Sequence, residues 1–229
     1  MIKISIIIPC FNEHGTIAQI IDKILEIKIF NFEIIVIDDF SSDRSREILK
    51  KLSEKKIQNL ILNEKNYGKG YSIRQGIKEA TGDLILIQDA DLEYDPKDYE
   101  KLFNPILHNK ADVVFGSRFI GSEERNVLYF WHSLGNYFLT LLSNIFTNLN
   151  LSDMECCYKV FKSDIIKNID LKENRFGFEP EVTAKIAKKD LRIFEVGVKY
   201  YGRKYSDGKK ITWKDGFSAI RCIIKYNLG

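Results

Sequence analysis

The strongest constraint on the fold is a regular alternation between short apolar runs and helical patterns in the first half of the chain. The runs are rich in isoleucine, leucine and valine, as buried strands are. We expect strands at 3–9, 33–38, 59–63, 83–88 and 112–116. Helical patterns lie between them, for example at 17–25 and 43–56. Strands that alternate with helices form βαβ units, so we predict an α/β fold with a mainly parallel central sheet flanked by helices.

The second half of the chain follows a different pattern. A long uncharged segment comes first, and we expect a helix near 179–189, a strand near 192–200 and a basic C-terminal helix. The chain has 229 residues, enough for one domain with a sizeable core. We therefore predict a single domain over 1–229, made of one half at 1–120 and another at 121–229.

Charge and cysteine content narrow the class of protein. The formal net charge is only +3, which argues against a nucleic-acid partner. The four cysteines form no CxxC pair, so neither a zinc site nor a disulfide framework is predicted. Reduced thiols fit the cytosol. No signal peptide is recognisable, and no stretch of about 20 apolar residues predicts a transmembrane helix, so we expect a cytoplasmic protein.

Polar clusters follow four of the predicted strands. In open α/β sheets, ligands bind beyond the carboxyl ends of the strands. The clusters at these ends are Asn12-Glu13, Asp38-Asp39, Asp89-Ala90-Asp91 and Gly116-Ser117-Arg118. We therefore expect the ligand site to be built from them.

The acidic turn after the fourth run is the sharpest of these signals. Asp89 and Asp91 are one residue apart directly after a strand of leucine and isoleucine, so both carboxylates can face one cation. Mg²⁺ and Mn²⁺ prefer oxygen ligands and usually take one or two carboxylates plus substrate phosphates. The alternative is that these acids only cap the next helix, as Asp95-Pro96 is expected to do. We favour the metal site.

Two further segments carry weaker signals. One carboxylate of Asp38-Asp39 could accept a hydrogen bond from a nucleoside, although the segment also suits a turn that leads into a helix. The loop around Lys69 is glycine-rich, but it matches neither a P-loop nor a dinucleotide fingerprint. Lys69 could lie near a diphosphate, and a structural turn is an equal alternative.

Taken together, the motifs resemble a known family over nearly the whole chain and in matching order. They are PCFNE at 9–13, VIDDFSSD at 36–43, GKG at 68–70, ATGD at 80–83, DAD at 89–91, GSRF at 116–119, SDMECCYKVF at 152–161, FGFEPEVTAKIAK at 176–188 and YYGRKYSDGKKITWKDG at 201–216. The first six resemble family 2 glycosyltransferases of the GT-A fold. The last three resemble one branch of it, the dolichol-phosphate mannosyltransferase-like (polyprenyl-phosphate glycosyltransferase) group.

The resemblance implies an inverting transfer of a sugar from a UDP- or GDP-sugar, with Mg²⁺ or Mn²⁺ as the cofactor. It assigns 1–120 to the nucleotide sugar and 121–229 to the acceptor. The resemblance places Pro9, Phe11, Glu13 and Asp39 in the nucleoside pocket, Asp89, Asp91 and Glu93 at the metal, and Arg118 and Arg203 at the phosphates of donor or acceptor. We add Lys69 and Ala90 to the expected nucleotide site, and we expect Asp89, Asp91, Arg118 and Arg203 to be the catalytic residues.

The chain departs from the pattern of this branch on the acceptor side. Glutamine often stands where this chain has Glu93, and a second acceptor-side arginine is replaced by His132 or by nothing. A lipid phosphate is nonetheless attractive, since it is already anionic and needs cations but no general base. The second half offers Arg118, Arg125, Arg203, Lys204, Lys209 and Lys210. A hydroxyl acceptor would need a base, and the candidates are Glu155 and Asp153.

Two segments suggest contact with a membrane surface. The stretch 126–152 has no charged residue and carries Trp131, Leu134, Phe138, Leu141, Leu142, Ile145 and Leu149 at helical spacing. An amphipathic helix at the lipid interface and an ordinary core-packing helix are both consistent with this pattern. The basic amphipathic segment 213–228 leaves the same two alternatives open.

We therefore predict a glycosyltransferase that acts on polyprenyl or dolichyl phosphate as a peripheral protein at the cytoplasmic face of a membrane. Three alternatives stay open: a hydroxyl acceptor on a glycan or glycolipid, a sugar-phosphate nucleotidyltransferase, and a non-catalytic binding module. Self-association into a homo-oligomer is also left open.

Overall fold

The computed structural model describes residues 2–121, 126–127, 129–203 and 213–228. Its strands are β1 (Lys3–Cys10), β2 (Asn31–Asp38), β3 (Asn59–Leu62), β4 (Leu84–Ile87), β5 (Val113–Ser117), β6 (Lys159–Lys162) and β7 (Ile193–Gly197). Its helices are α1 (Ile17–Glu26), α2 (Ser45–Ser53), α3 (Lys69–Glu79), the short 3₁₀ turn η1 (Pro96–Asp98), α4 (Tyr99–Leu107), α5 (Phe130–Thr147), α6 (Ser163–Lys167), α7 (Phe178–Ala187) and α8 (Trp213–Leu228).

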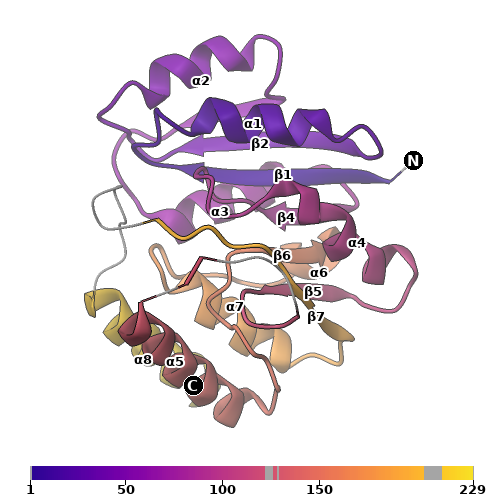
Figure 1. Cartoon of the computed structure of the whole chain (residues 1–229), viewed down its shortest axis with the longest axis vertical. Coiled ribbons are helices and arrows are strands. Elements are labelled where there is room, and N and C mark those ends of the chain that lie inside the picture. The colour runs from indigo at the N-terminus through magenta and orange to yellow at the C-terminus, as the bar shows by residue number, and fades with distance from the viewer. Residues whose placement is uncertain (1, 122–125, 128, 204–212, 229) are drawn as a thin grey trace.

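These strands form one mainly parallel sheet in the order β3-β2-β1-β4-β6-β5-β7 (Figure 1). The pairs β2–β3, β1–β2, β1–β4 and β5–β7 are parallel, whereas β6 runs antiparallel to both β4 and β5. The predicted α/β fold is thus confirmed, as are the strands expected from the apolar runs. Strand β6 is an addition that the sequence pattern did not predict.

The core explains why the first half folds as it does. The isoleucine runs of β1 and β2 are buried almost throughout, because helices cover the sheet on both faces. Helix α1 buries Ile17, Ile20, Ile21 and Ile24, the stripe that its periodicity predicted. Asp95 accepts a hydrogen bond from the Lys97 amide at 3.1 Å and so caps η1 as expected.

Helices α5 and α8 pack side by side at the end of the molecule away from α1 and α2 (Figure 1). Within the described residues, no helix combines the length and the apolar character needed to cross a bilayer. Of the basic residues expected at the acceptor, Arg125, Lys204, Lys209 and Lys210 lie outside the described residues.

An amphipathic helix usually packs its apolar face on the core, but much of the apolar stripe of α5 faces outward. Trp131 and Ile145 are 76% and 68% exposed, while Thr140 and Ser143 are buried. The exposed stripe also includes Leu134, Phe138 and Leu141, whereas Leu142 and Leu149 pack on the core. An ordinary core-packing helix therefore does not describe the exposed part of this stripe.

The inward side of α5 is held by polar contacts in addition to the apolar packing of Leu139, Leu142 and Phe146. Thr140 Oγ1 accepts a hydrogen bond from the Met154 amide at 3.2 Å, and Asn144 Nδ2 donates to the Leu151 carbonyl at 2.7 Å. These contacts fix the rotation of the helix about its own axis. Its polar face therefore packs on the protein, and the exposed part of its apolar stripe faces outward.

Candidate active site

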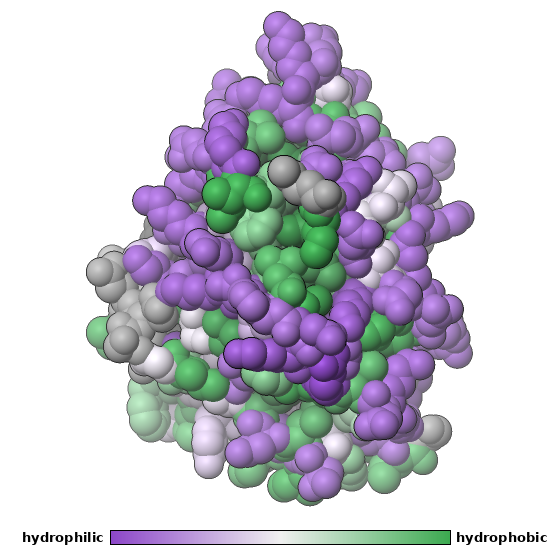
Figure 2. Space-filling view, turned by 90° about the vertical axis from the view of Figure 1, so that its right-hand side faces the viewer, coloured by the Kyte–Doolittle hydropathy of each residue, from purple (hydrophilic) through white to green (hydrophobic). Residues whose placement is uncertain are grey.

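A cavity of about 1000 Å³ opens where the carboxyl ends of β1, β2 and β4 meet the second half of the chain. It is lined by every site residue expected from the sequence, namely Pro9, Phe11, Glu13, Asp39, Lys69, Asp89, Ala90, Asp91, Glu93, Arg118 and Arg203. The face where β1 begins lies at the opposite ends of the strands, and there hydrophilic side chains surround a hydrophobic patch (Figure 2). The expectation that the ligand site lies beyond the carboxyl ends of the strands thus located the cavity correctly.

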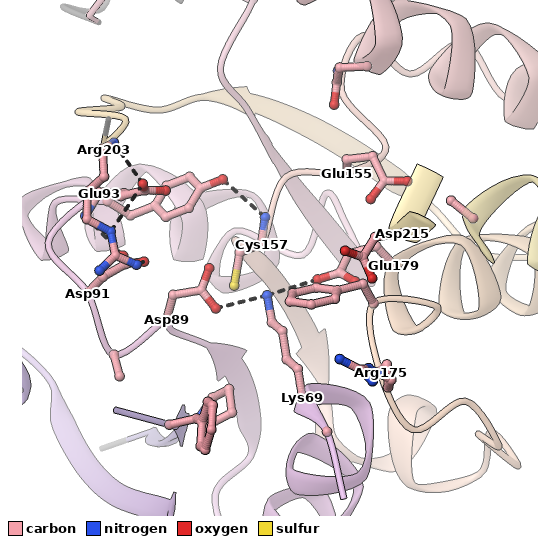
Figure 3. Close-up of a pocket in the computed structure, with 18 of the residues that line it drawn as sticks. Lys69, Asp89, Asp91, Glu93, Glu155, Cys157, Arg175, Glu179, Arg203 and Asp215 are labelled. Carbon is pink, nitrogen blue, oxygen red and sulfur yellow. Dashed lines mark hydrogen bonds and ion pairs between the residues drawn. The ribbon is translucent and has the colours of Figure 1, made fainter. Parts of the chain in front are cut away.

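Lys69 lies at the centre of one set of ionic contacts in this cavity (Figure 3). Its ammonium contacts Asp89 at 2.9 Å and Glu179 at 3.0 Å. Burial opposes the charge on Lys69, but the ion pair with Asp89 outweighs it and raises the pKa of Lys69 well above its usual value. Burial likewise opposes the charge on Asp89, and Lys69 holds the pKa of that carboxyl below its usual value. Both groups are therefore charged at neutral pH.

Arg203 gathers a second set of carboxylates, Glu13 from the segment after β1 and Asp91 and Glu93 from the acidic turn after β4 (Figure 3). Its guanidinium contacts Glu13 through two nitrogens at 3.1 Å each, and Asp91 at 2.9 Å. Glu93 accepts from the Arg203 amide at 2.8 Å and from the Tyr200 hydroxyl at 2.9 Å. This cluster joins the end of the second half of the chain to the strand ends of the first.

The acidic turn itself is electrostatically crowded. Burial raises the pKa of Asp91, and the carboxylates of Asp89 and Glu93 raise it further, while Arg203 acts in the opposite direction. Carboxylates that repel one another are stabilised by an added cation. The oxygen donors therefore suit Mg²⁺ or Mn²⁺ held by one or two carboxylates plus phosphates. In the part of the chain that the structure describes, no group of three or more such side chains is arranged as a complete metal site.

Asp39 holds the glycine-rich loop against the end of β2. One of its oxygens accepts from the Tyr67 amide at 2.9 Å and from Asn63 Nδ2 at 2.8 Å, and the other accepts from the Gly68 amide at 2.6 Å. The carboxylate is buried but lines the cavity. The structure thus shows Asp39 positioning the loop that carries Lys69.

Arg118 is joined to Asp153 by a bidentate contact. Two of its nitrogens contact the two oxygens of Asp153 at 2.7 Å each, and a third contact reaches Asn136 Oδ1 at 2.9 Å. Asn136 Nδ2 also donates to Asp153 at 3.1 Å. Asp153 is fully buried in this network and does not line the cavity. Of the two base candidates, only Glu155 lines it.

The segment before α7 and the first turn of α7 contribute residues that the sequence did not single out. Arg175, Phe176 and Glu179 all line the cavity. Arg175 is exposed and makes no hydrogen bond or ion pair with any described residue, unlike Lys69 and Arg203. Glu179 belongs to a recognised motif, but nothing in its spacing indicated a charged partner.

The position of this segment is set by the glycine-rich loop. The Tyr71 amide donates to the Asn174 carbonyl at 3.0 Å. A Cβ on Gly68 would lie 2.4 Å from the same carbonyl oxygen, and one on Gly70 would lie 2.5 Å from the Glu173 carbonyl oxygen. Only glycines allow so close an approach. The GKG motif was therefore the available signal that another backbone segment packs here.

Comparison with known proteins gives a consistent result. The model of the family described as Glycosyl transferase family 2 matches residues 5–170. The dolichol-phosphate mannosyltransferase of Pyrococcus furiosus is 28% identical over 216 residues, which cover 91% of this chain and 60% of that protein. The dodecaprenyl-phosphate galacturonate synthase of Rhizobium johnstonii is 24% identical over 213 residues, which cover 91% of this chain and 62% of that protein. The chain thus spans less than two thirds of the length of either relative.

A solved structure supports the fold. Glucosyl-3-phosphoglycerate synthase from Mycobacterium tuberculosis, in complex with Mn²⁺, UDP and phosphoglyceric acid, matches with a TM-score of 0.75 at 17% identity. The match covers 98% of this chain and 78% of that one. The predicted GT-A type of fold is thereby confirmed.

Proposed function

This chain belongs to glycosyl transferase family 2, and we propose that it transfers a sugar from a UDP- or GDP-sugar to a polyprenyl or dolichyl phosphate, with inversion at the anomeric carbon. The observation that carries the proposal is the cavity at the strand ends, where the turn Asp89–Asp91 meets the cations Lys69 and Arg203. The half 1–120 supplies the donor side, to which 121–229 adds Arg203, and the half 121–229 supplies the acceptor side.

The donor side is built to hold a nucleoside diphosphate. Pro9, Phe11, Glu13 and Asp39 lie at the ends of β1 and β2, where the nucleoside would bind. Asp89, Asp91 and Glu93 would hold Mg²⁺ or Mn²⁺, which when bound would neutralise the charge that develops on the departing diphosphate. Lys69 and Arg203 are positioned to contribute positive charge to the same group.

The acceptor side suits an anionic nucleophile. A phosphate oxygen can attack the anomeric carbon without losing a proton, so the site needs a cation to bind the phosphate and no base. Arg175 is the best placed of the described cations, because it lines the cavity and has no carboxylate partner among the described residues. The planar guanidinium suits bidentate contact with phosphate. It would take the place of the second acceptor-side arginine that the sequence lacks.

A donor and acceptor panel tests the function. The purified protein is incubated with Mn²⁺ or Mg²⁺ and each of several UDP- and GDP-sugars, with a short polyprenyl phosphate, the matching polyprenol or no acceptor. We expect a glycosylated lipid phosphate from one donor and no product from the polyprenol. Transfer to the polyprenol or to a glycan hydroxyl would favour the hydroxyl-acceptor alternative, in which Glu155 is the candidate base. Binding of a nucleotide without turnover on any acceptor would contradict the enzyme assignment.

Arg175→Gln is expected to raise the KM for polyprenyl phosphate about 10- to 100-fold, the value of one or two charge-assisted hydrogen bonds. The KM for the nucleotide sugar should change little. Arg175→Lys should recover part of the lost affinity for the lipid, since lysine keeps the positive charge but lacks the paired N–H donors of the planar guanidinium. Steady-state kinetics with each substrate varied in turn measure the two KM values separately. Arg44→Gln, at an exposed arginine outside the cavity, is the matched control; equal KM values for the lipid in the Arg175→Gln variant and the wild type would contradict the assignment.

We also propose that the exposed stripe of α5 rests on the membrane surface that carries the acceptor. Phe130, Trp131, Tyr137, Phe138 and Ile145 are each more than half exposed, and the helix carries no charged side chain. Large exposed apolar patches mark interaction surfaces. Trp131 also lines the cavity, so a surface against α5 would be next to the site.

Phe138→Glu combined with Ile145→Glu is expected to reduce the fraction of protein that sediments with anionic phosphatidylglycerol vesicles about tenfold or more. Each change removes an exposed apolar side chain that would be buried at the lipid interface, and adds a charge. Ile29→Glu, at a residue that is 60% exposed outside α5 and α8, is the control and should sediment like the wild type. Unchanged sedimentation of the double variant would contradict the proposed contact.

A further inference from the structure

Two carboxylate oxygens in the cavity lack a hydrogen-bond partner within the described part of the chain. They are Oε1 of Glu155 and Oε2 of Glu179, and both atoms are buried. Burying an acceptor without a partner costs about 1–3 kcal/mol. Both residues line the cavity, so a ligand bound there can supply the missing hydrogen bonds.

The fold holds Glu179 firmly in place. It lies in the first turn of α7, where the helix dipole favours a negative charge, and it is only 4% exposed. Its other oxygen, Oε1, contacts the Lys69 ammonium at 3.0 Å. Because Lys69 also contacts Asp89, Glu179 is connected through Lys69 to the acidic turn where the diphosphate is proposed to bind.

Glu155 lies on the same side of the cavity as Glu179, while Arg203, Glu93 and Asp91 occupy the other side (Figure 3). Burial and the nearby charge of Glu179 raise the pKa of Glu155 to about 8. At neutral pH Glu155 therefore carries its proton most of the time and can donate, whereas Glu179 acts as an acceptor toward the Lys69 ammonium. A ligand group that both donates and accepts hydrogen bonds satisfies such a pair, and a hydroxyl is the simplest group of this kind.

On the basis of the function proposed above, we propose that Glu155 and Glu179 bind hydroxyl groups of the transferred sugar and select a neutral hexose over a hexuronate. A neutral sugar beside the diphosphate presents only hydroxyls to the pair. A hexuronate would bring a carboxylate close to Glu179 and Asp89, and like charges brought together in a buried site are strongly unfavourable. Arg175 is exposed, whereas Glu179 is only 4% exposed and Glu155 is half-buried.

Donor pairs that differ only at C6 test this inference. The affinities of UDP-glucose and UDP-glucuronate, of UDP-galactose and UDP-galacturonate, and of GDP-mannose and GDP-mannuronate are measured by calorimetry with Mn²⁺ present, together with UDP and GDP alone. We expect the neutral member of the bound pair to bind about tenfold tighter or more than the hexuronate. Equal affinity, or tighter binding of the hexuronate, overturns the inference.

Two isosteric variants test which glutamate causes the preference for a neutral hexose over a hexuronate. Glu179→Gln and Glu155→Gln keep the size of the side chain, and the amide introduced by Glu179→Gln would still offer an oxygen to Lys69. We expect the affinity ratio to fall several-fold, mainly in Glu179→Gln and through tighter binding of the hexuronate. Any change in diphosphate binding through Lys69 affects both donors of a pair equally and cancels in the ratio. Glu100→Gln, at an exposed glutamate outside the cavity, should keep the wild-type ratio.

The two proposals fail in different ways. A wild-type ratio that persists in both glutamine variants overturns the role of the pair while the nucleotide site stands. If neither UDP nor GDP binds the wild type, the donor class itself is wrong, and the inference about its sugar is overturned with it.

Discussion

Asp91→Asn is expected to lower the rate of sugar transfer about a thousandfold, which corresponds to about 4 kcal/mol of transition-state stabilisation. The substitution is nearly isosteric, and the new side chain keeps the oxygen that accepts from the Glu93 amide at 3.0 Å. What it removes is the negative charge that we propose as a ligand for Mg²⁺ or Mn²⁺. Initial rates with saturating donor and acceptor, measured over a titration of Mn²⁺, test the expectation. Addition of EDTA to the wild type should cause a comparable loss.

The control for this prediction comes from the same turn. Asp95 caps η1 through the Lys97 amide and does not line the cavity, so Asp95→Asn makes the same chemical change outside the site. Asparagine is also a good N-cap, and the variant should keep most of its activity. Thermal unfolding of both variants shows whether the fold survives. An Asp91→Asn enzyme that retains more than about a tenth of wild-type activity, or a wild type insensitive to EDTA, would rule out the metal assignment.

The first half of the fold could be predicted because its signals are local. Each isoleucine-rich run is buried on both faces of a parallel sheet, and each helix between them shows its own apolar stripe. The polar clusters then follow from topology, since parallel strands in sequence bring their carboxyl ends to one edge. Glu13, Asp39 and Asp91 therefore reach one cavity although they are distant in sequence.

The second half was harder to predict because its contacts are not local. Strand β6 has four residues and pairs antiparallel with both neighbours, which no period in its own sequence reveals. Helix α5 shows a clear apolar stripe, but periodicity alone does not say which face is inward. The answer depends on polar contacts such as that between Asn136 and Asp153, which only the assembled fold brings together.

The partners of the charged site residues were also beyond prediction from the sequence. Arg118 and Arg203 were expected at phosphates, and the structure pairs both with carboxylates of the chain itself. Glu179 is distant from Lys69 in sequence and contacts it directly. Side-chain charge predicted which residues belong to the site, whereas the pairing among them depends on distances that the sequence does not encode locally.

Gly68→Ala is expected to destabilise the protein by about 2–5 kcal/mol and to lower activity at least about tenfold. Gly68 has φ +103°, a backbone conformation that residues other than glycine rarely adopt. The Cβ of an alanine at this position would lie 2.4 Å from the Asn174 carbonyl oxygen. The obstacle is backbone, so relief requires the two loops to move apart. Thermal and denaturant unfolding measure the first effect, and transfer rates measure the second.

The loss of activity should exceed what instability alone causes, because Gly68 lies between two parts of the proposed site. On one side it precedes Lys69, which contacts Asp89 and Glu179; on the other it packs against the segment that carries Arg175. A displacement of about 1 Å in such groups can cost about 10²-fold in rate. At a temperature where the variant is fully folded, kcat should therefore still be reduced. Gly15→Ala is the control, because an added Cβ there meets nothing within 4 Å, and it should leave both stability and kcat near wild type. A Gly68→Ala enzyme that is destabilised but fully active when folded would show that the loop supports the fold without positioning the site.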